Sequence, residues 1–312
     1  MTPFFSVIIP LYNKAKFIEE TLQSVINQDF LDFEIIIVDD GSTDQSIEIV
    51  KQFKDERIVL IQQENKGVSE ARNNGISIAK GQFIALIDAD DYWYKNHLNV
   101  LKQQITQFPN AGLYCNNYEI YLDKNTKRDA NFNFNYGTDS LIAKDFFRGN
   151  IINSIAWTSA VAFSKDKFDA VGGFNINLDT SEDLDLWIKF ALKYEVAFNP
   201  TITMAYKYYI PDSLTKKETN LIRLNFINSY SKEEANNAAL KHYLDINRYA
   251  LAIRCKVLKE FSIYKTAKRQ ILLSNLNFKQ KLLLYSPRIM LVVLKKIQTV
   301  LIKNNIYISA FK

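Results

Sequence analysis

Three aspartates stand close together in IDADDYW, residues 87 to 93, at the end of an apolar run. Asp88, Asp90 and Asp91 fall within four consecutive positions, so their charges repel one another at neutral pH. Such a cluster persists if a cation lies among the carboxylates or if the segment is a solvated turn. The first explanation predicts a site for a metal ion or a charged ligand, and the second predicts a loop without chemistry.

A second acidic pair, Asp39 and Asp40, ends another apolar run, FEIIIVDD. Ligands of a doubly wound sheet bind at the carboxyl ends of its strands, so one crevice can hold both clusters. Carboxylate oxygens that leave room for phosphate oxygens suit Mg²⁺ or Mn²⁺. The residue types in DDGSTD also suit a strand-to-helix turn, so this stretch alone does not distinguish a site from a helix cap.

A third candidate, Arg72, lies in ENKGVSEARNNG, between the two acidic clusters in the sequence. The planar guanidinium of an arginine matches phosphate oxygens, so Arg72 would suit a diphosphate or a base edge. Taken in isolation, a surface arginine on a helix is the simpler explanation.

The elements that must position these residues alternate along the first 110 residues. Short runs rich in Val and Ile are typical of strands covered on both faces, and the longer runs between them have helical spacing. The strands are expected in FSVIIP, FEIIIVDD, RIVLIQQ and QFIALIDAD, and the helices in KAKFIEETLQSVINQ, STDQSIEIVKQF and VSEARNNGISIAKG. This alternation predicts an α/β fold with a doubly wound, mostly parallel sheet and flanking helices.

The pattern changes twice further along the chain. Residues 112–209 are rich in aromatic side chains and contain a helical stretch, SEDLDLWIKFALKY, which suggests a continuation of the same sheet. After Lys216 the sequence is typical of helices. We therefore expect an α/β domain that contains the candidate site residues over residues 1–215 and a helical region over residues 216–312.

Composition narrows the class of protein. The 312 residues are 47% hydrophobic, which is enough for a sizeable core, and the two cysteines lie far apart outside any metal-binding spacing. The N-terminal MTPFFSVIIPLYN is better explained as a first strand than as a signal peptide, so a cytoplasmic protein is expected. The net charge of +5 is uneven, because residues 241–312 contain 15 Lys and Arg and 2 Asp and Glu. Such a basic tail favours an anionic surface as partner.

Five stretches in order resemble family 2 glycosyltransferases with the nucleotide-sugar-binding GT-A fold, over about residues 4–215. They are SVIIPLYNKAKFIEETLQSVINQ, EIIIVDDGSTDQS, ENKGVSEARNNGI, AKGQFIALIDADD and SEDLDLWIKFA. The resemblance implies an inverting enzyme that moves a sugar from a nucleotide diphosphate sugar, commonly a UDP-sugar, to a hydroxyl of a glycan or a lipid-linked saccharide in cell-surface polysaccharide synthesis.

The resemblance also implies roles for individual residues. Pro10 and Tyr12 match the wall against which the base stacks, and Asp40 matches the carboxylate that recognises the base. Arg72 is similar to the arginine that contacts the nucleotide, and Asp88 to the acid beside the ribose.

The chemistry itself would fall to two further acids. Asp90 resembles the ligand of a divalent metal, Mn²⁺ or Mg²⁺, which neutralises the leaving diphosphate. Asp183, next to Glu182, matches the base that takes a proton from the attacking hydroxyl.

One departure from the family pattern concerns the metal. Many members carry an Arg and a His after the last core strand, whereas this chain has AYKYYIPDSLT, and its two histidines, His97 and His242, lie elsewhere. The missing His leaves open a non-enzymatic alternative, a nucleotide-sugar-binding partner subunit with an impaired site. A sugar-phosphate nucleotidyltransferase is disfavoured, because PLYNKAKF is not a Gly-rich basic loop.

The basic tail contains an amphipathic stretch, residues 288–303, after SPR interrupts the apolar run. Its spacing predicts a basic helix in a membrane interface, which would make the protein peripheral at the inner face of the cell membrane. A helix packed on the catalytic domain, or one that holds a homodimer together, is the alternative. Nucleic acid is not expected as a partner, because aromatic residues do not alternate with the basic ones.

Overall fold

A computed structural model describes residues 2–123, 125–178, 180–208 and 219–303, with only the backbone described for residues 299–303. The chain forms two compact units. Unit 1 comprises Met1–Phe146 and Asn153–Ser213, and unit 2 comprises Phe147–Ile152 and Leu214–Lys312. The boundary predicted at residue 215 falls within 209–218, outside the described residues.

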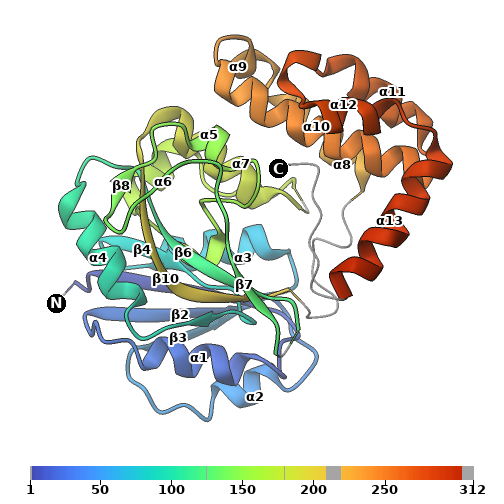
Figure 1. Ribbon diagram of the computed structural model, residues 1–312. Helices are drawn as coiled ribbons and strands as arrows, with labels where there is room; N and C mark the ends of the chain where they lie inside the picture. The colour runs from blue at the N-terminus through green and yellow to red at the C-terminus, as the bar shows by residue number, and fades with distance from the viewer. Residues whose placement is uncertain (1, 124, 179, 209–218, 304–312) are drawn as a thin grey trace. The chain divides into compact units, whose positions relative to one another are not determined.

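Unit 1 is built on one mixed sheet with the strand order β3-β2-β1-β4-β9-β6-β10-β5 (Figure 1). The long strands pair in parallel, β1 with β2 and β4, β2 with β3, and β6 with β10. Strand β9 pairs antiparallel with both β4 and β6. The strands are β1 (Phe5–Leu11), β2 (Phe33–Asp39), β3 (Ile58–Gln62), β4 (Phe83–Leu86), β5 (Tyr92–Trp93), β6 (Leu113–Tyr121), β7 (Lys127–Asp129), β8 (Leu141–Ile142), β9 (Val161–Ser164) and β10 (Val196–Lys207).

The core explains why these apolar runs form strands. Every residue of β1 is buried, and all but one residue of β2 is buried, as expected for strands covered by helices on both faces. The α/β fold with a mostly parallel sheet is therefore confirmed. Among the described residues up to 208, the α-helices are α1 (Ile18–Ile26), α2 (Ser46–Val50), α3 (Val68–Ile78), α4 (His97–Gln107), α5 (Phe146–Gly149), α6 (Lys165–Val171) and α7 (Glu182–Lys193).

Helix α3 lies very close to the sheet because residue 75 is glycine. A Cβ atom on Gly75 would lie 2.8 Å from Cγ2 of Ile8 and 3.0 Å from Cγ2 of Val38. Both distances are shorter than ordinary carbon contacts, so a larger side chain would force the helix outward. This contact fixes the distance between α3 and the sheet, and with it the position of Arg72.

The C-terminal part of unit 2 is helical, as predicted for residues after 216. Its helices are α8 (Asn220–Ser229), α9 (Ser231–Ala235), α10 (Ala238–Leu258), α11 (Phe261–Gln270), α12 (Phe278–Tyr285) and α13 (Arg288–Lys303). Helix α10 contacts each of the others. None of the helices in the described ranges is both long and apolar enough to cross a membrane.

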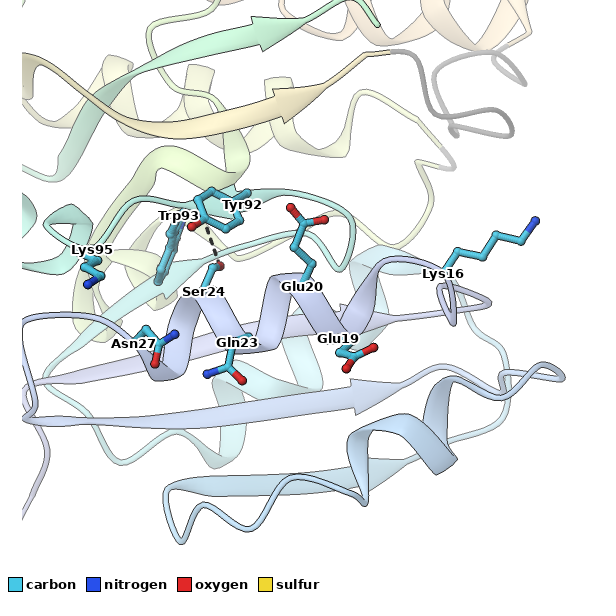
Figure 2. A pocket seen from close by; sticks show the side chains of 9 residues that line it. All are labelled: Lys16, Glu19, Glu20, Gln23, Ser24, Asn27, Tyr92, Trp93 and Lys95. Carbon is cyan, nitrogen blue, oxygen red and sulfur yellow. Dashed lines mark hydrogen bonds between the residues drawn. The ribbon is translucent and has the colours of Figure 1, made fainter. Parts of the chain in front are cut away.

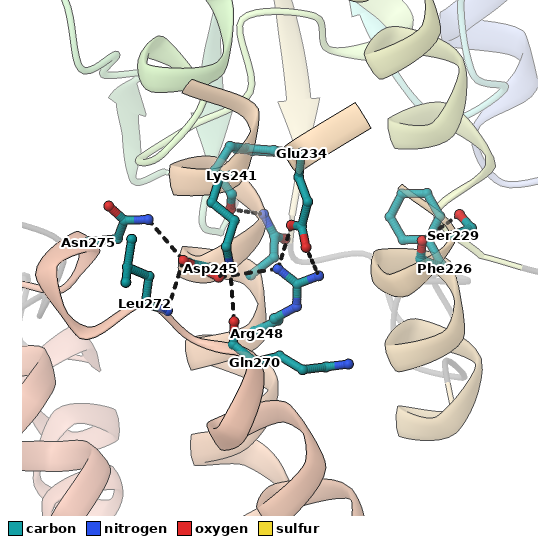
Figure 3. Close-up of polar contacts among 11 residues, drawn as sticks. Phe226, Ser229, Glu234, Lys241, Asp245, Arg248, Gln270, Leu272 and Asn275 are labelled. Atoms are coloured by element: carbon teal, nitrogen blue, oxygen red, sulfur yellow. Dashed lines mark hydrogen bonds and ion pairs between the residues drawn. The ribbon is translucent and has the colours of Figure 1, made fainter. Parts of the chain in front are cut away.

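A buried ionic network ties the turn after α11 to α10 (Figure 3). The fully buried carboxylate of Asp245 accepts hydrogen bonds from Lys241, from Leu272 N at 3.1 Å and from Asn275 Nδ2 at 2.8 Å. Arg248 lies 3.2 Å from Asp245 and binds Glu234 through two nitrogens, at 2.7 and 2.9 Å. Buried charges persist in a protein when they are paired in this way.

Candidate active site

The carboxyl ends of three neighbouring strands bring the sequence-predicted residues together. In the sheet β1 lies between β2 and β4, so Tyr12, Asp40 and Asp88 follow adjacent strands at one edge. The amide of Asp40 donates to Leu11 O at 2.8 Å, which holds the first two strand ends side by side. Pro10 is buried within β1, whereas the ring of Tyr12 is 47% exposed. This edge is where ligands of doubly wound sheets bind.

The carboxylate of Asp40 organises the loop that leads into α3. It accepts hydrogen bonds from Gln63 Nε2 and Lys66 N, both at 2.8 Å, and from Gly67 N at 2.9 Å. Gly67 has a φ of 90°, a conformation that favours glycine, and it directly precedes α3. Asp40 therefore fixes where α3 begins, in addition to any contact with a ligand.

Residues 88–91 form a turn, not the extended segment expected from the sequence. The amide of Asp91 donates to Asp88 O at 3.0 Å, which closes the turn. The three aspartates differ in burial. Asp88 and Asp90 are partly exposed, and Asp91 is buried.

Arg72 lies at the centre of the site and joins two carboxylates. Its Nη2 lies 2.7 Å from Asp88 Oδ1, and its Nη1 lies 2.8 Å from Glu182 Oε1. The guanidinium is almost fully buried, and its carbon lies 5.2 Å from the centre of the Phe174 ring. Burial would lower the pKa of Arg72, but the two carboxylates raise it, so the group stays charged. Arg72 is thus one cation at the crowded carboxylates, through its contact with Asp88.

Glu182 and Asp183 begin α7. Burial, and then the charge of Asp183, raise the pKa of Glu182 to about 7, while Arg72 acts in the opposite direction. Asp183 is half-buried, and its Oδ1 accepts a hydrogen bond from Leu184 N at 2.7 Å. Through Glu182 and Arg72, the start of α7 is connected to Asp88 at the end of β4. The candidate base therefore lies in the same part of unit 1 as the acidic turn.

Asp90 forms an ion pair with Lys14, a residue that the sequence reasoning did not single out. Lys14 follows β1 by three residues, and its amide donates to Ser46 Oγ at 2.9 Å. The only sequence signal for this pair was the need for a positive charge near the acidic cluster. That need did not identify Lys14 as the residue that supplies the charge. Asp90 therefore meets an ammonium group in the structure.

The acidic turn has part of the donor set that a divalent cation requires. Among the described residues no three His, Cys, Asp or Glu side chains converge as a metal site. The two partly exposed carboxylates, Asp88 and Asp90, nevertheless offer the hard oxygen atoms that Mg²⁺ or Mn²⁺ takes together with substrate phosphates. These residues fit a metal that arrives with a diphosphate, and they do not fit an all-protein metal cage.

Asp91 has a structural role that the sequence did not reveal. Ser159 Oγ donates to Asp91 Oδ2 at 2.6 Å and accepts from Asp88 N at 3.0 Å, so one hydroxyl holds both ends of the turn. Burial, and then the charges of Asp90 and Asp88, raise the pKa of Asp91 well above its usual range. Ser159 lies two residues before β9, in a short 3₁₀ turn, and the place of β9 beside β4 was not predicted.

Two further side chains, those of His97 and Trp157, belong to the core more than to the site. His97 is fully buried, with its ring stacked on Trp93 at 4.1 Å, so it is part of the core; burial also lowers its pKa to about 3. Trp157 is half-buried between Tyr118 and Tyr206, with ring centres 5.3 and 4.3 Å away.

A cavity of about 350 Å³ lies elsewhere on unit 1, between α1 and the segment from Tyr92 to Lys95 (Figure 2). Glu20 and Ser24 point from α1 toward Tyr92 and Trp93, and Trp93 N donates to Ser24 Oγ at 3.2 Å. None of the residues predicted for the site lines this cavity. The candidate site is therefore an open edge of the sheet and not this cavity.

Comparison with known proteins gives relatives with the same sequence pattern. GlyG of Streptococcus pneumoniae, a glycosyltransferase, is 40% identical over 137 residues, which cover 43% of this chain and 44% of GlyG. TuaG of Bacillus subtilis, a putative teichuronic acid biosynthesis glycosyltransferase, is 30% identical over 219 residues, 69% of this chain and 83% of TuaG. The chain thus spans less than half the length of GlyG, and 21% of the length of GlyA from the same organism.

A solved structure has the same fold. Residues 1–349 of S. aureus TarS, in complex with UDP-GlcNAc, match with a TM-score of 0.69 at 20% identity, over 84% of this chain and 79% of that one. The family model of glycosyl transferase family 2 matches residues 6–172, more than half of the chain. The match includes the strand ends that carry Asp40, Asp88 and Asp90. The protein is therefore a member of glycosyl transferase family 2, a family of transferase enzymes.

Proposed function

We propose that the protein transfers a sugar from a UDP-sugar to a hydroxyl of a glycan or lipid-linked saccharide, in the synthesis of a cell-surface polysaccharide. The observation that carries the proposal is the bridge made by Arg72, because it connects Asp88 to Glu182, the neighbour of Asp183. A donor held at the acidic turn would thus have a carboxylate base nearby. The similar fold of TarS, which was solved in complex with UDP-GlcNAc, supports a UDP-sugar donor.

The names of relatives support the acceptor class. TuaG is described as a teichuronic acid enzyme, and WcaA of Escherichia coli, 31% identical over 202 residues, as a putative colanic acid biosynthesis glycosyl transferase. Both names refer to cell-surface polysaccharides. We place the reaction in the cytoplasm, at the inner face of the cell membrane, where a lipid-linked acceptor would be located.

The proposed reaction is a direct displacement with inversion. The carboxylate of Asp183 takes the proton of the acceptor hydroxyl as its oxygen attacks the anomeric carbon, and the bond from that carbon to the diphosphate oxygen breaks. The products are the glycosylated acceptor, UDP and a protonated Asp183. Because the hydroxyl attacks opposite the diphosphate, the anomeric configuration inverts.

The remaining predicted residues would bind the donor. Tyr12 has an exposed ring that a uracil can stack on, next to the buried Pro10. Asp40 would recognise the base from the loop that it organises, and Asp88 would receive the ribose, with Arg72 holding Asp88 in place. Asp90 would hold Mn²⁺ or Mg²⁺, which neutralises charge on the leaving diphosphate when bound.

A panel of nucleotide sugars tests this proposal. The full chain is incubated with UDP-, GDP- and dTDP-sugars, with and without Mn²⁺, and both hydrolysis and thermal stabilisation are measured. We expect UDP-sugars to give the largest effects and Mn²⁺ to increase them. In Asp90→Asn, the Mn²⁺-dependent part of the hydrolysis and of the thermal stabilisation should be lost. The fold should be kept, because the side chain is partly exposed. Unchanged Mn²⁺ dependence in that variant would contradict the metal assignment.

The same panel distinguishes the alternative, a nucleotide-sugar-binding subunit with an impaired site. The absence of a His in AYKYYIPDSLT favours this alternative. Stabilisation by UDP-sugars without any hydrolysis or transfer would support it. Turnover that is lost in Asp183→Asn would exclude it.

A further inference from the structure

Apolar side chains are unusually exposed in the last part of unit 2. Of the 20 large hydrophobic residues that the structure shows exposed, 12 lie between Leu258 and Ile297. Helix α13 is the densest part of this surface. Its exposed apolar face consists of Ile289, Met290, Val293, Leu294 and Ile297.

Helix α13 is attached to unit 2 through its first turns. Leu291 is 4% exposed and faces the helix bundle, and Arg288 Nε donates to Val257 O at 3.0 Å. Within unit 2 the helix then extends away from the bundle that α10, α11 and α12 form (Figure 1). In contrast to Leu291, Ile289 is 75% exposed and Val293 and Ile297 are each 49% exposed. The apolar face therefore points away from the bundle that holds the helix.

The charge around this face has one sign. Residues 261–312 contain ten Lys and Arg and no Asp or Glu. Lys295 and Lys296 are exposed on α13 itself. Lys296 follows Val293 by three residues and borders the apolar face, whereas Lys295 follows Leu291 by four residues and lies on the other side of the helix. Tyr285, at the end of α12, is also exposed, and the ammonium of Lys268 lies 3.8 Å from the centre of its ring.

We propose that the exposed face of α13 docks on a lipid bilayer that contains anionic lipids. An apolar helix face on a basic surface lies in a membrane interface with its side chains among the acyl chains and the nearby cations at the lipid phosphates. A second copy of the chain fits less well, because it would bring two basic surfaces together. Nucleic acid fits less well because the face is aliphatic and offers no rings for base stacking.

This proposal rests on the membrane location proposed above and names α13 as the element responsible for it. It can be tested without donor or acceptor. The full chain is mixed with vesicles of phosphatidylcholine and phosphatidylglycerol, or of phosphatidylcholine alone, and the bound fraction is measured by sedimentation. We expect binding to the mixed vesicles that weakens as salt increases, and weaker binding to phosphatidylcholine alone. Failure of the full chain to bind mixed vesicles at low salt overturns the proposal, whatever the enzyme does with UDP-sugars.

A matched pair of double variants tests the face itself. Val293→Asp with Ile297→Asp should weaken binding to mixed vesicles by at least about tenfold, because two apolar side chains are lost and two negative charges are added. Leu31→Asp with Ile78→Asp makes the same charge change at exposed apolar positions of unit 1 and should bind vesicles nearly as well as the native protein. Equal losses in both would show a general charge effect and overturn the assignment to α13.

A charge variant keeps the test valid if the aspartate variants misfold. Lys295→Gln with Lys296→Gln leaves the apolar face intact. It should reduce both the binding to mixed vesicles and the salt dependence of that binding, and leave binding to vesicles of phosphatidylcholine alone unchanged. Sedimentation equilibrium identifies the competing partner. A native dimer that becomes a monomer in Val293→Asp with Ile297→Asp, without vesicle binding in either protein, would assign the face to a second copy.

Discussion

Two buried arginines, one in each unit, have similar partners but different surroundings. Arg72 and Arg248 are both almost fully buried, and each contacts two carboxylates. Around Arg248 the carboxylate of Asp245 is fully buried and is surrounded by donors from its own unit. Around Arg72 the side chain of Asp88 is 34% exposed, and Glu182 is followed by the half-buried Asp183.

The difference shows what a buried ionic network can and cannot indicate. The Arg248 network satisfies its own charges and joins segments of a helical bundle, so stability explains it. The Arg72 network leaves partly exposed carboxylates at the end of the sheet where ligands bind. These carboxylates are accessible to a ligand, so stability alone does not explain this network. A buried arginine is thus weak evidence for a site until the exposure of its partners is known.

The largest expected effect is on catalysis, from Asp183→Asn. If Asp183 is the general base, turnover should fall by about 10²- to 10⁴-fold while the affinity for UDP-sugar is retained. Initial rates and donor binding by calorimetry separate the two quantities. Asp185→Asn, two residues further along α7, is the matched control. Normal turnover in Asp183→Asn would require another base, with Glu182 the first to test.

Asp245→Ala is expected to lower the stability of the protein strongly and to leave donor binding and turnover unchanged in the folded protein. It removes a carboxylate that is contacted by two cations and two other donors, so the free energy of unfolding should fall by about 3–5 kcal/mol. Urea unfolding followed by circular dichroism measures this change. Glu233→Ala, at an exposed position of α9, should change stability little. A loss of donor affinity in folded Asp245→Ala would break the distinction between the two networks.

Replacing each arginine by lysine tests the same distinction with a smaller effect. Arg72→Lys keeps the charge but loses the fork that reaches both carboxylates, so the dissociation constant for UDP-sugar should rise about 10- to 100-fold, or about 1.4 to 2.8 kcal/mol. Arg248→Lys should leave donor binding unchanged and lower the free energy of unfolding by about 1.5–3 kcal/mol. Equal donor affinities in the two variants would contradict the role proposed for Arg72.

The smallest expected effect concerns pH and Glu182. Because its pKa is raised to about 7 in the folded protein, the folded state holds this proton more tightly than the unfolded state. The resulting stabilisation is complete below the ordinary glutamate pKa of about 4.5 and is lost as the pH rises through about 7. Urea unfolding across this range should show a steeper fall in stability for the native protein than for Glu182→Gln. Parallel curves would show that Glu182 does not titrate there.

Local sequence signals predicted the scaffold well and the contacts within the site less well. Continuous Val and Ile runs identified the parallel strands, and helical spacing placed Arg72 on α3 and Asp183 at the start of α7, because these signals depend on near neighbours. The pairing of Lys14 with Asp90 joins residues 76 positions apart. The Ser159 bridge depends on β9 entering the sheet beside β4. Neither contact has a local signal, so only the tertiary structure reveals them.

The close contact between α3 and the sheet has an evolutionary consequence. Arg72 lies one turn before Gly75, and any side chain larger than hydrogen at position 75 would meet Ile8 and Val38. An outward shift of α3 by a few tenths of an ångström would move the guanidinium away from its two carboxylates. Position 75 can therefore accept a larger residue only when smaller residues arise at positions 8 and 38, so three residues without chemistry of their own must change together.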